Sequence, residues 1–107
     1  MKKLGELKEN DVFYIINWDA GYVMSIEKCV VKDTVDIKIG RIIHYIKDKD
    51  EYKDVYGITI ELSEYKETYV DVYYQSQACS DKDVLLEILE TSKEKFLYNY
   101  RKILKNI

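Results

Sequence analysis

The feature that most constrains the fold is a change in the spacing of apolar residues near residue 80. Up to residue 75, short segments are rich in β-branched and aromatic residues, and several of them alternate apolar and polar side chains, which is the period of a half-buried β-strand. From residue 81 onward, apolar residues recur at the spacing of an amphipathic helix. The sequence therefore predicts a single α+β domain over residues 1–107, with its strands first and its helix last.

Five segments rich in β-branched and aromatic residues predict five strands. Their ranges are 12–17, 22–32, 35–47, 55–63 and 68–75. Turn-forming or charged residues separate them, notably Lys32-Asp33-Thr34, the loop 48–54 and residues 64–67. Because strands joined by short turns usually lie side by side, we expect an antiparallel meander curled into a small barrel or half-barrel whose open side the helix covers.

The helix is expected over residues 81–105, with Ser80 as its N-cap. Its main stripe is Leu85, Ile88, Leu89, Phe96, Tyr100 and Ile103, a second stripe is Leu86, Leu97 and Leu104, and Tyr98 lies on the polar side. A continuous helix of this length would extend about 37 Å, which is long for a domain of this size. The alternative is a helix that breaks near Thr91. The wide apolar arc also predicts a two-fold dimer through the second stripe.

The composition indicates which partners and which cellular compartment to expect. The chain has 17 basic and 20 acidic side chains, a net charge of −3, which predicts no strong attraction to nucleic acid or to a membrane surface. No apolar run approaches the ~20 residues that span a bilayer, and no signal peptide is expected. Cys29 and Cys79 are expected to be free, mostly buried thiols in a reducing cytoplasm.

Residues suited to catalysis or metal binding are few. The single histidine, His44, lies in an apolar strand without a local nucleophile or acid partner, which favours a structural role. One histidine and two cysteines cannot complete a zinc site, and the loop 48–54 lacks the glycine and closing glutamate of a calcium loop. We expect no enzymatic activity, cofactor or metal. An enzyme or ligand binder with its site near His44 is the alternative.

Tyrosine is the most distinctive residue type, with 11 copies against 2 Phe and 1 Trp. Alternation along residues 68–75 predicts that Tyr69, Asp71 and Tyr73 point outward and that Tyr74 is buried. Acids border this row, which predicts a docking face for a protein partner with a basic surface. The candidate partner-binding residues are Glu61, Glu64, Tyr65, Glu67, Tyr69, Asp71 and Tyr73.

Two alternatives to this docking face stay open. Ordinary cross-strand pairing on a solvated sheet face would also place tyrosines opposite one another. A nucleic-acid-binding accessory protein would use the same stacking rings, although residues 55–75 carry four acids and a single lysine. Nucleic acid is therefore not the expected partner.

Two short segments resemble known small proteins. Residues 7–15 (LKENDVFYI) resemble the opening strand of SH3-like barrel proteins, with Asn10-Asp11 in place of Gly-Asp. Residues 79–90 (CSDKDVLLEILE) are similar to the closing segment of short accessory proteins of phages and mobile elements. The resemblance implies a small non-enzymatic protein, and some such proteins inhibit host defence, including anti-CRISPR proteins with acidic surfaces. We therefore expect a cytoplasmic protein-binding module.

Overall fold

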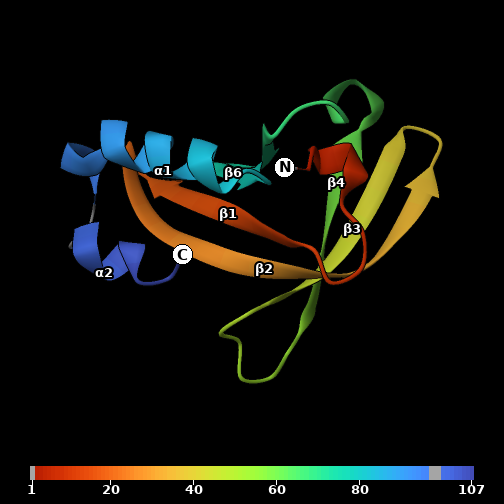
Figure 1. Ribbon diagram of the computed structural model, residues 1–107, viewed down its shortest axis with the longest axis horizontal. Helices are drawn as coiled ribbons and strands as arrows, with labels where there is room; N and C mark the ends of the chain where they lie inside the picture. The colour runs from red at the N-terminus through yellow and green to blue at the C-terminus, as the bar shows by residue number, and fades with distance from the viewer. Residues whose placement is uncertain (1, 97–99) are drawn as a thin grey trace.

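The computed structural model describes residues 2–96 and 100–107 and has an α+β fold (Figure 1). The described strands form one curled antiparallel sheet with the order β4-β3-β2-β1-β6-β5. They are β1 (Val12–Asp19), β2 (Tyr22–Ile37), β3 (Gly40–Lys47), β4 (Val55–Glu61), β5 (Tyr69–Tyr73) and β6 (Ser76–Cys79). The helices are α1 (Lys82–Thr91) and α2 (Tyr100–Leu104), with 3-10 turns η1 (Leu4–Glu6), η2 (Leu62–Glu64) and η3 (Lys93–Lys95). The expected fold class is confirmed, because a curled antiparallel sheet is followed by C-terminal helical segments.

The strand order differs from the expected five-stranded meander. Strands β1 to β4 form a meander, but the chain then passes through η2 and returns as the hairpin β5–β6. It is β6 that pairs with β1, with Asn17 opposite Ser76 and Tyr14 opposite Cys79. Strand β6 was not predicted, because Ser76, Gln77 and Ala78 have little intrinsic preference for strands. They form one only because β1 and β5 pair with them on either side.

The expected turn at residues 32–34 is wrong. Strand β2 continues through it, and the chain reverses at the two residues 38 and 39. The register with β3 shifts between Val31 and Asp33, so a bulge takes up the extra residue at the place where a turn was expected. The first position of β3 is a glycine, Gly40, because a Cβ there would clash with the backbone carbonyl of Ile60 on β4.

The sheet buries apolar side chains on both faces. One cluster contains residues from both outermost strands, β4 and β5, and therefore lies inside the curl. It consists of Leu4, Leu7, Phe13, Ile15, Cys29, Val31, Ile43, Tyr45, Ile58, Ile60, Val70 and Ala78. The second cluster, on the opposite face, consists of Tyr14, Ile16, Val23, Ile26, Cys79, Leu85, Leu89 and Ile103. Four consecutive residues of β1, 13–16, are buried as a result.

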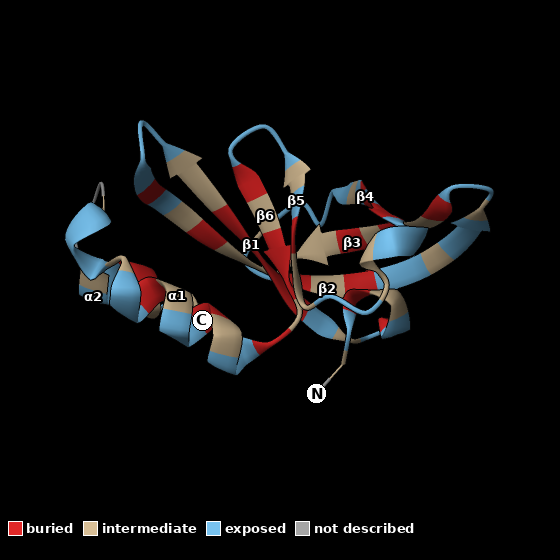
Figure 2. Cartoon of the chain, turned by 90° about the horizontal axis from the view of Figure 1, so that it is seen from above, coloured by how far each residue is buried: buried red, intermediate tan, exposed pale blue. Residues whose placement is uncertain are grey.

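The helices cover the outer face of the curl, and not its open side as expected. Figure 2 shows the buried positions of α1 turned toward the sheet and its exposed positions turned away. The open side is instead filled from the N-terminal segment, where Leu4 and Leu7 are fully buried. Each such leucine contributes about 1.5–3 kcal/mol by leaving water.

The continuous helix expected over residues 81–105 is wrong, and the alternative, a break near Thr91, is what the structure has. Helix α1 ends at Thr91, and Phe96 forms a parallel bridge with Val23 at the edge of β2. Asp81, not Ser80, is the N-cap, because its carboxylate accepts the amides of Asp83 and Val84. Of the second predicted stripe, Leu104 packs against the second cluster and Leu97 lies outside the described residues, as does Tyr98, which was predicted on the polar side.

Candidate functional site

Three of the predicted partner-binding acids gather where β4 ends and the chain turns through η2. We call Glu61, Glu64 and Glu67 the acidic corner. Glu61 and Glu67 are exposed, and Glu64 is half-buried. The amide of Glu61 donates to Oε1 of Glu64 at 3.0 Å, and the amide of Glu67 donates to the carbonyl of Glu64 at 3.0 Å. These local bonds hold three carboxylates on one compact turn.

Two exposed apolar side chains border the acidic corner. Ile39 lies in the turn between β2 and β3, and Leu62 begins η2; they are 60% and 61% exposed. The amide of Leu62 donates to the carbonyl of Ile39 at 3.1 Å, so the two residues lie side by side. In a continued strand Leu62 would share the buried face of Ile58 and Ile60, but β4 ends at Glu61 and the 3-10 turn rotates the leucine out to solvent.

Tyr65 packs against Gly5 and Arg41 and anchors the acidic corner. A Cβ on Gly5 would lie 2.6 Å from Cβ of Tyr65, so only glycine allows this contact. The guanidinium of Arg41 lies 5.7 Å from the ring centre of Tyr65 and donates to the carbonyl of Gly5 at 2.6 Å. Tyr65 therefore fastens η2 to the N-terminal segment.

The predicted outward row of Tyr69, Asp71 and Tyr73 is not one row. The register of β5 with β6 shifts between Asp71 and Tyr73, which turns the two tyrosines in different directions. Tyr69 is half-buried against the second cluster, so its expected exposure is wrong. Tyr73 is 49% exposed, as expected, and its hydroxyl donates to the carbonyl of Gly57 on β4.

The expected burial of Tyr74 is wrong. Its side chain is 91% exposed, because β5 ends at Tyr73 and Tyr74 lies in the turn before β6. The following residue, Gln75, has φ of 58°, which marks the reversal of the chain. Alternation along a strand ends where the strand ends, and the sequence analysis placed that end two residues too late.

A polar cluster, which the sequence analysis missed, lies on the inner face of the curl. Asn17 donates to Oγ of Ser25 at 3.0 Å and to Oε1 of Glu27 at 2.6 Å, and Ser76 donates to Oδ1 of Asn17 at 2.6 Å. Lys47 completes it with an ion pair to Glu27 at 2.7 Å. The available signal was that Asn17 and Glu27 each stand two residues from a buried apolar residue on the same strand face.

Lys47 also makes a cation–π contact with an aromatic ring. Its Nζ lies 4.2 Å from the ring centre of Tyr56, which stacks on the buried ring of Tyr45. Burial alone would lower the pKa of Lys47, but the hydrogen bond and charge of Glu27, with smaller effects of Tyr56 and Cys29, raise the pKa above its ordinary value. The lysine is therefore held in its charged form.

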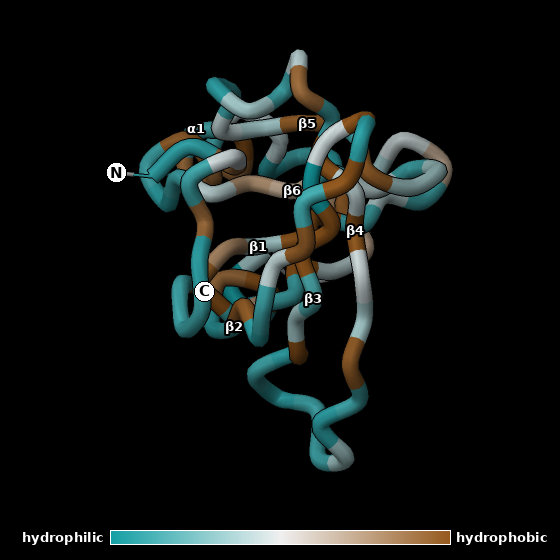
Figure 3. The backbone as a smooth tube through the Cα atoms, turned by 90° about the vertical axis from the view of Figure 1, so that its right-hand side faces the viewer, coloured by the Kyte–Doolittle hydropathy of each residue, from teal (hydrophilic) through white to brown (hydrophobic). Residues whose placement is uncertain are grey.

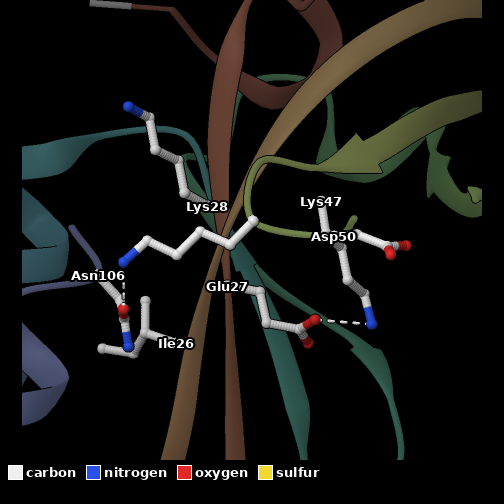
Figure 4. A pocket seen from close by; sticks show the side chains of 7 residues that line it. Ile26, Glu27, Lys28, Lys47, Asp50 and Asn106 are labelled. Atoms are coloured by element: carbon white, nitrogen blue, oxygen red, sulfur yellow. Dashed lines mark hydrogen bonds and ion pairs between the residues drawn. The ribbon is translucent and has the colours of Figure 1, made fainter. Parts of the chain in front are cut away.

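Two hollows lie along the start of β2, beyond the point where β3 ends. One, of about 280 Å³, is lined by Ile26, Glu27, Lys28, Lys47, Lys49, Asp50 and Asn106 (Figure 4). The other, of about 250 Å³, is lined by Met24, Ser25, Lys102, Ile103 and Asn106. Asn106 belongs to both, and Lys49 donates to its Oδ1 at 2.7 Å. The two hollows therefore form one groove, the β2 groove.

The residues considered for catalysis do not converge. His44 lies on the sheet with its Nδ1 2.6 Å from Oδ1 of Asp33, and it lines neither hollow of the β2 groove. Cys29 and Cys79 are free and buried in different clusters, as expected for free thiols. Burial raises the pKa of both thiols, that of Cys29 to about 12.

Within residues 2–96 and 100–107, no group of three or more His, Cys, Asp or Glu side chains is arranged to hold a metal ion. Among the same residues, none of the helices has the length and apolar character needed to cross a membrane. Comparison of the chain with protein-family models, with curated proteins and with solved structures finds no match.

Proposed function

We propose that the chain is a non-enzymatic protein-binding module whose partner presents a basic surface. The observation that carries the proposal is the pair Ile39 and Leu62, exposed side by side next to the acidic corner. Exposed apolar side chains with a charged rim are typical of protein-interaction surfaces. The apolar pair would supply the buried centre of the contact.

The charges around this pair indicate the charge expected on the partner's surface. Residues 55–75 carry Glu61, Glu64, Glu67 and Asp71 against one lysine, although the whole chain has a net charge of only −3. Carboxylates in such a patch attract a basic surface and repel an acidic one. Of the three predicted partner-binding tyrosines, Tyr73 is 49% exposed, whereas Tyr65 packs against Arg41 and Tyr69 against the second cluster.

We further propose that the partner is a bacterial host defence protein, which the module inhibits on behalf of a phage or mobile element. The support is the resemblance of residues 7–15 and 79–90 to SH3-like barrel accessory proteins. The proposal includes a cytoplasmic location, for which the two free buried thiols are the support.

The test is affinity capture from a bacterial lysate with three forms of the chain. The corner variant is Leu62→Lys with Glu67→Lys, and the control is Tyr52→Lys with Glu51→Lys on the hydrophilic loop between β3 and β4 (Figure 3). Both variants change the charge by the same amount at exposed positions. We expect one protein that the wild type and the control retain and that the corner variant loses.

Two results would overturn the proposal. One is a partner that the corner variant retains as well as the control does. The other is no stable protein partner together with tight binding of nucleic acid at about 0.15 M salt, where exposed charges are already screened.

We propose separately that the chain forms a two-fold dimer, for which the exposure of one leucine is the support. Leu86 on α1 remains 39% exposed, while Leu104 of the same predicted stripe packs within the chain. A dimer would therefore use the exposed face of α1 near Leu86. A monomer mass in light scattering at micromolar concentration would refute it.

A further inference from the structure

We propose that the outer face of β2, β3 and β4 receives an amphipathic helix of the partner, whose polar side is basic. The helix is taken to belong to the protein that contacts the acidic corner, so the inference rests on the proposed function. The contact then extends from Ile39 and Leu62 across the sheet.

Apolar residues form two rows across this outer face. The strand register sets the members of a row opposite one another. The first row, from β1 to β4, is Val12, Val30, Ile46 and Val55. The second row, from β2 to β4, is Val35, Ile42 and Thr59. We call the six apolar members of the two rows the bare face.

The bare face points away from the inner cluster. On β3, Ile43 and Tyr45 belong to the inner cluster, so Ile42 and Ile46, which alternate with them, lie on the outer side. The β4 positions agree, because a Cβ on Gly57 would lie 3.8 Å from Cγ2 of Ile42. The bare face therefore looks to the same side of the sheet as the second cluster.

The helices of the chain cover only the other half of this side. Leu85, Leu89 and Ile103 join the second cluster with residues of β1 and of the start of β2. Phe96 and Tyr100 pack against that cluster as well. Figures 1 and 2 both show α1 and α2 at the end of the molecule away from β3 and β4.

The bare face remains accessible. Among the described residues, neither buried cluster includes any of its members. Val12, Val35 and Val55 are 39%, 44% and 58% exposed. A group of apolar side chains left uncovered on one face is typical of a docking surface.

The bare face leads to the acidic corner. On β4, Glu61 follows Thr59 on the outer side, and both are exposed. On β2, Ile37 follows Val35, and the turn after it carries Ile39. Since Glu61 borders both surfaces, an occupant of the bare face also reaches the acidic corner.

A helix is the occupant because the chain already uses one on the other half of the same side. Helix α1 turns Leu85 and Leu89, four residues apart, toward the sheet. A helix also satisfies its own backbone hydrogen bonds, so it needs no open strand edge. The length fits as well: from Ile46 to Gly40 the strand extends about 20 Å, which about 13 residues of helix span.

The charges of the face favour a basic helix. Between the two apolar rows, Nδ1 of His44 lies 2.6 Å from Oδ1 of the exposed Asp33. At the end of the face stands the exposed Glu61. The nearby lysines, Lys32 in the bulge of β2 and Lys38 in the turn, lie outside the rows. Basic side chains along the helix would pair with the two carboxylates.

A second copy of the chain does not supply this helix. On α1, the exposed Leu86 is accompanied by Asp83, Glu87 and Glu90, and Lys82 is the one basic residue of the helix. The acids of α1 would be repelled by the carboxylates on the bare face and in the acidic corner. The expected occupant is therefore a different protein.

The test is photo-crosslinking in bacterial cells from two exposed positions on β4. A photoreactive phenylalanine analogue replaces Val55 in one form and Thr59 in another. Both forms should capture the protein that a form with the analogue at Leu62 captures. The captured segment should be basic, with apolar residues at helical spacing.

The spacing of the two attachment points distinguishes a helix from a strand. Four residues of β4 extend about 13 Å. A helix that lies along the strands toward the acidic corner covers that length with about nine residues. An extended segment would cover it with about four.

Failure of this inference differs from failure of the proposed function. An adduct from position 62 with none from positions 55 and 59 would overturn the helix and leave the acidic corner as the contact. Attachment about four residues apart, attachment to two separate segments, or an acidic segment would do the same. No protein adduct from position 62 would overturn both.

Charge variants measure the contribution of the face with the captured segment as a synthetic peptide. Val35→Lys with Thr59→Lys should weaken peptide binding by about tenfold or more. The control Tyr52→Lys with Tyr74→Lys adds the same charge at exposed positions and should bind as wild type does. If urea denaturation shows the double variant to be unfolded, the exposed Thr59→Lys alone decides. Equal binding by variant and control, or no gain of helical circular dichroism on binding, would overturn the proposal.

Discussion

The hydroxyl of Tyr73 on β5 donates a hydrogen bond to the backbone carbonyl of Gly57 on β4. These strands are the two outermost in the order β4-β3-β2-β1-β6-β5, so the bond joins the two ends of the sheet. A side-chain hydrogen bond therefore crosses the seam of the curl that encloses Tyr45, Phe13 and the rest of the inner cluster.

Tyr73→Phe tests the seam. The variant keeps the ring and removes the hydroxyl, so we expect the free energy of unfolding to fall by about 0.5–1.5 kcal/mol, the net worth of one hydrogen bond. Tyr74→Phe is the control, because Tyr74 is exposed, and should lie within about 0.5 kcal/mol of wild type. Urea denaturation measures both, and equal stability of the two variants would show that the seam bond contributes nothing.

Asn17→Ala tests the polar cluster on the inner face. The change leaves Ser76 without its acceptor and Glu27 without its donor from Asn17, and we expect a loss of about 1–3 kcal/mol. Ser25→Ala removes only one acceptor of Asn17 and should cost less. If both variants unfold at the same urea concentration as wild type, the cluster is not a stabilising network.

The two cysteines should be inert in the folded chain. Both are fully buried, and burial raises the pKa of each thiol, so the reactive thiolate is scarce at neutral pH. We expect a thiol reagent such as DTNB to label neither cysteine at about pH 8 until urea unfolds the chain. Stoichiometric labelling within seconds under native conditions would contradict this burial.

Alkaline solution should destabilise the fold. Burial raises the pKa of Cys29 from 9.0 to about 12, and burial also raises the pKa of Tyr45 above 10.0. Because the folded pKa exceeds the unfolded one, the stabilisation is complete below the unfolded pKa and is lost as the pH rises toward the folded value. Urea denaturation in reductant between about pH 8 and 11 should show Cys29→Ala losing less stability than wild type, and an equal loss would contradict the assignment.

The sequence was sufficient for the parts of the fold that depend on local pattern. The dense run of β-branched and aromatic residues in Val12–Asn17 and the helical spacing of Leu85 and Leu89 correctly predicted a strand and a helix. The break after Thr91 was only the alternative to a continuous helix, with the polar residues around Thr91 as its local signal. Such features require no knowledge of distant contacts.

The errors concern features that long-range contacts decide. Residues 32–34 read as a turn, but pairing of Asp33 with His44 keeps them extended. Ser76–Cys79 form a strand only because β1 and β5 lie on either side. Propensity is a weak guide wherever tertiary pairing competes with it.

In the candidate site, the exposure of the acidic side chains was predictable from the sequence, but the directions of the tyrosine side chains were less so. The acids Glu61, Glu67 and Asp71 are exposed, which their solvation favours. The directions of Tyr69 and Tyr73 depend on the register shift within β5, for which the sequence offers no marker. Ile39 and Leu62 meet only because the β2–β3 turn reaches η2.

Site-specific photo-crosslinking in bacterial cells tests the central claim most directly, namely that the chain binds a protein through the surface of Leu62 and the acidic corner. A photoreactive phenylalanine analogue replaces Leu62 in one form and Tyr52, exposed on the loop between β3 and β4, in the other. The account predicts a covalent adduct with one protein from position 62 and none of that adduct from position 52. An adduct of equal yield from both positions, or no protein adduct from position 62, would contradict it.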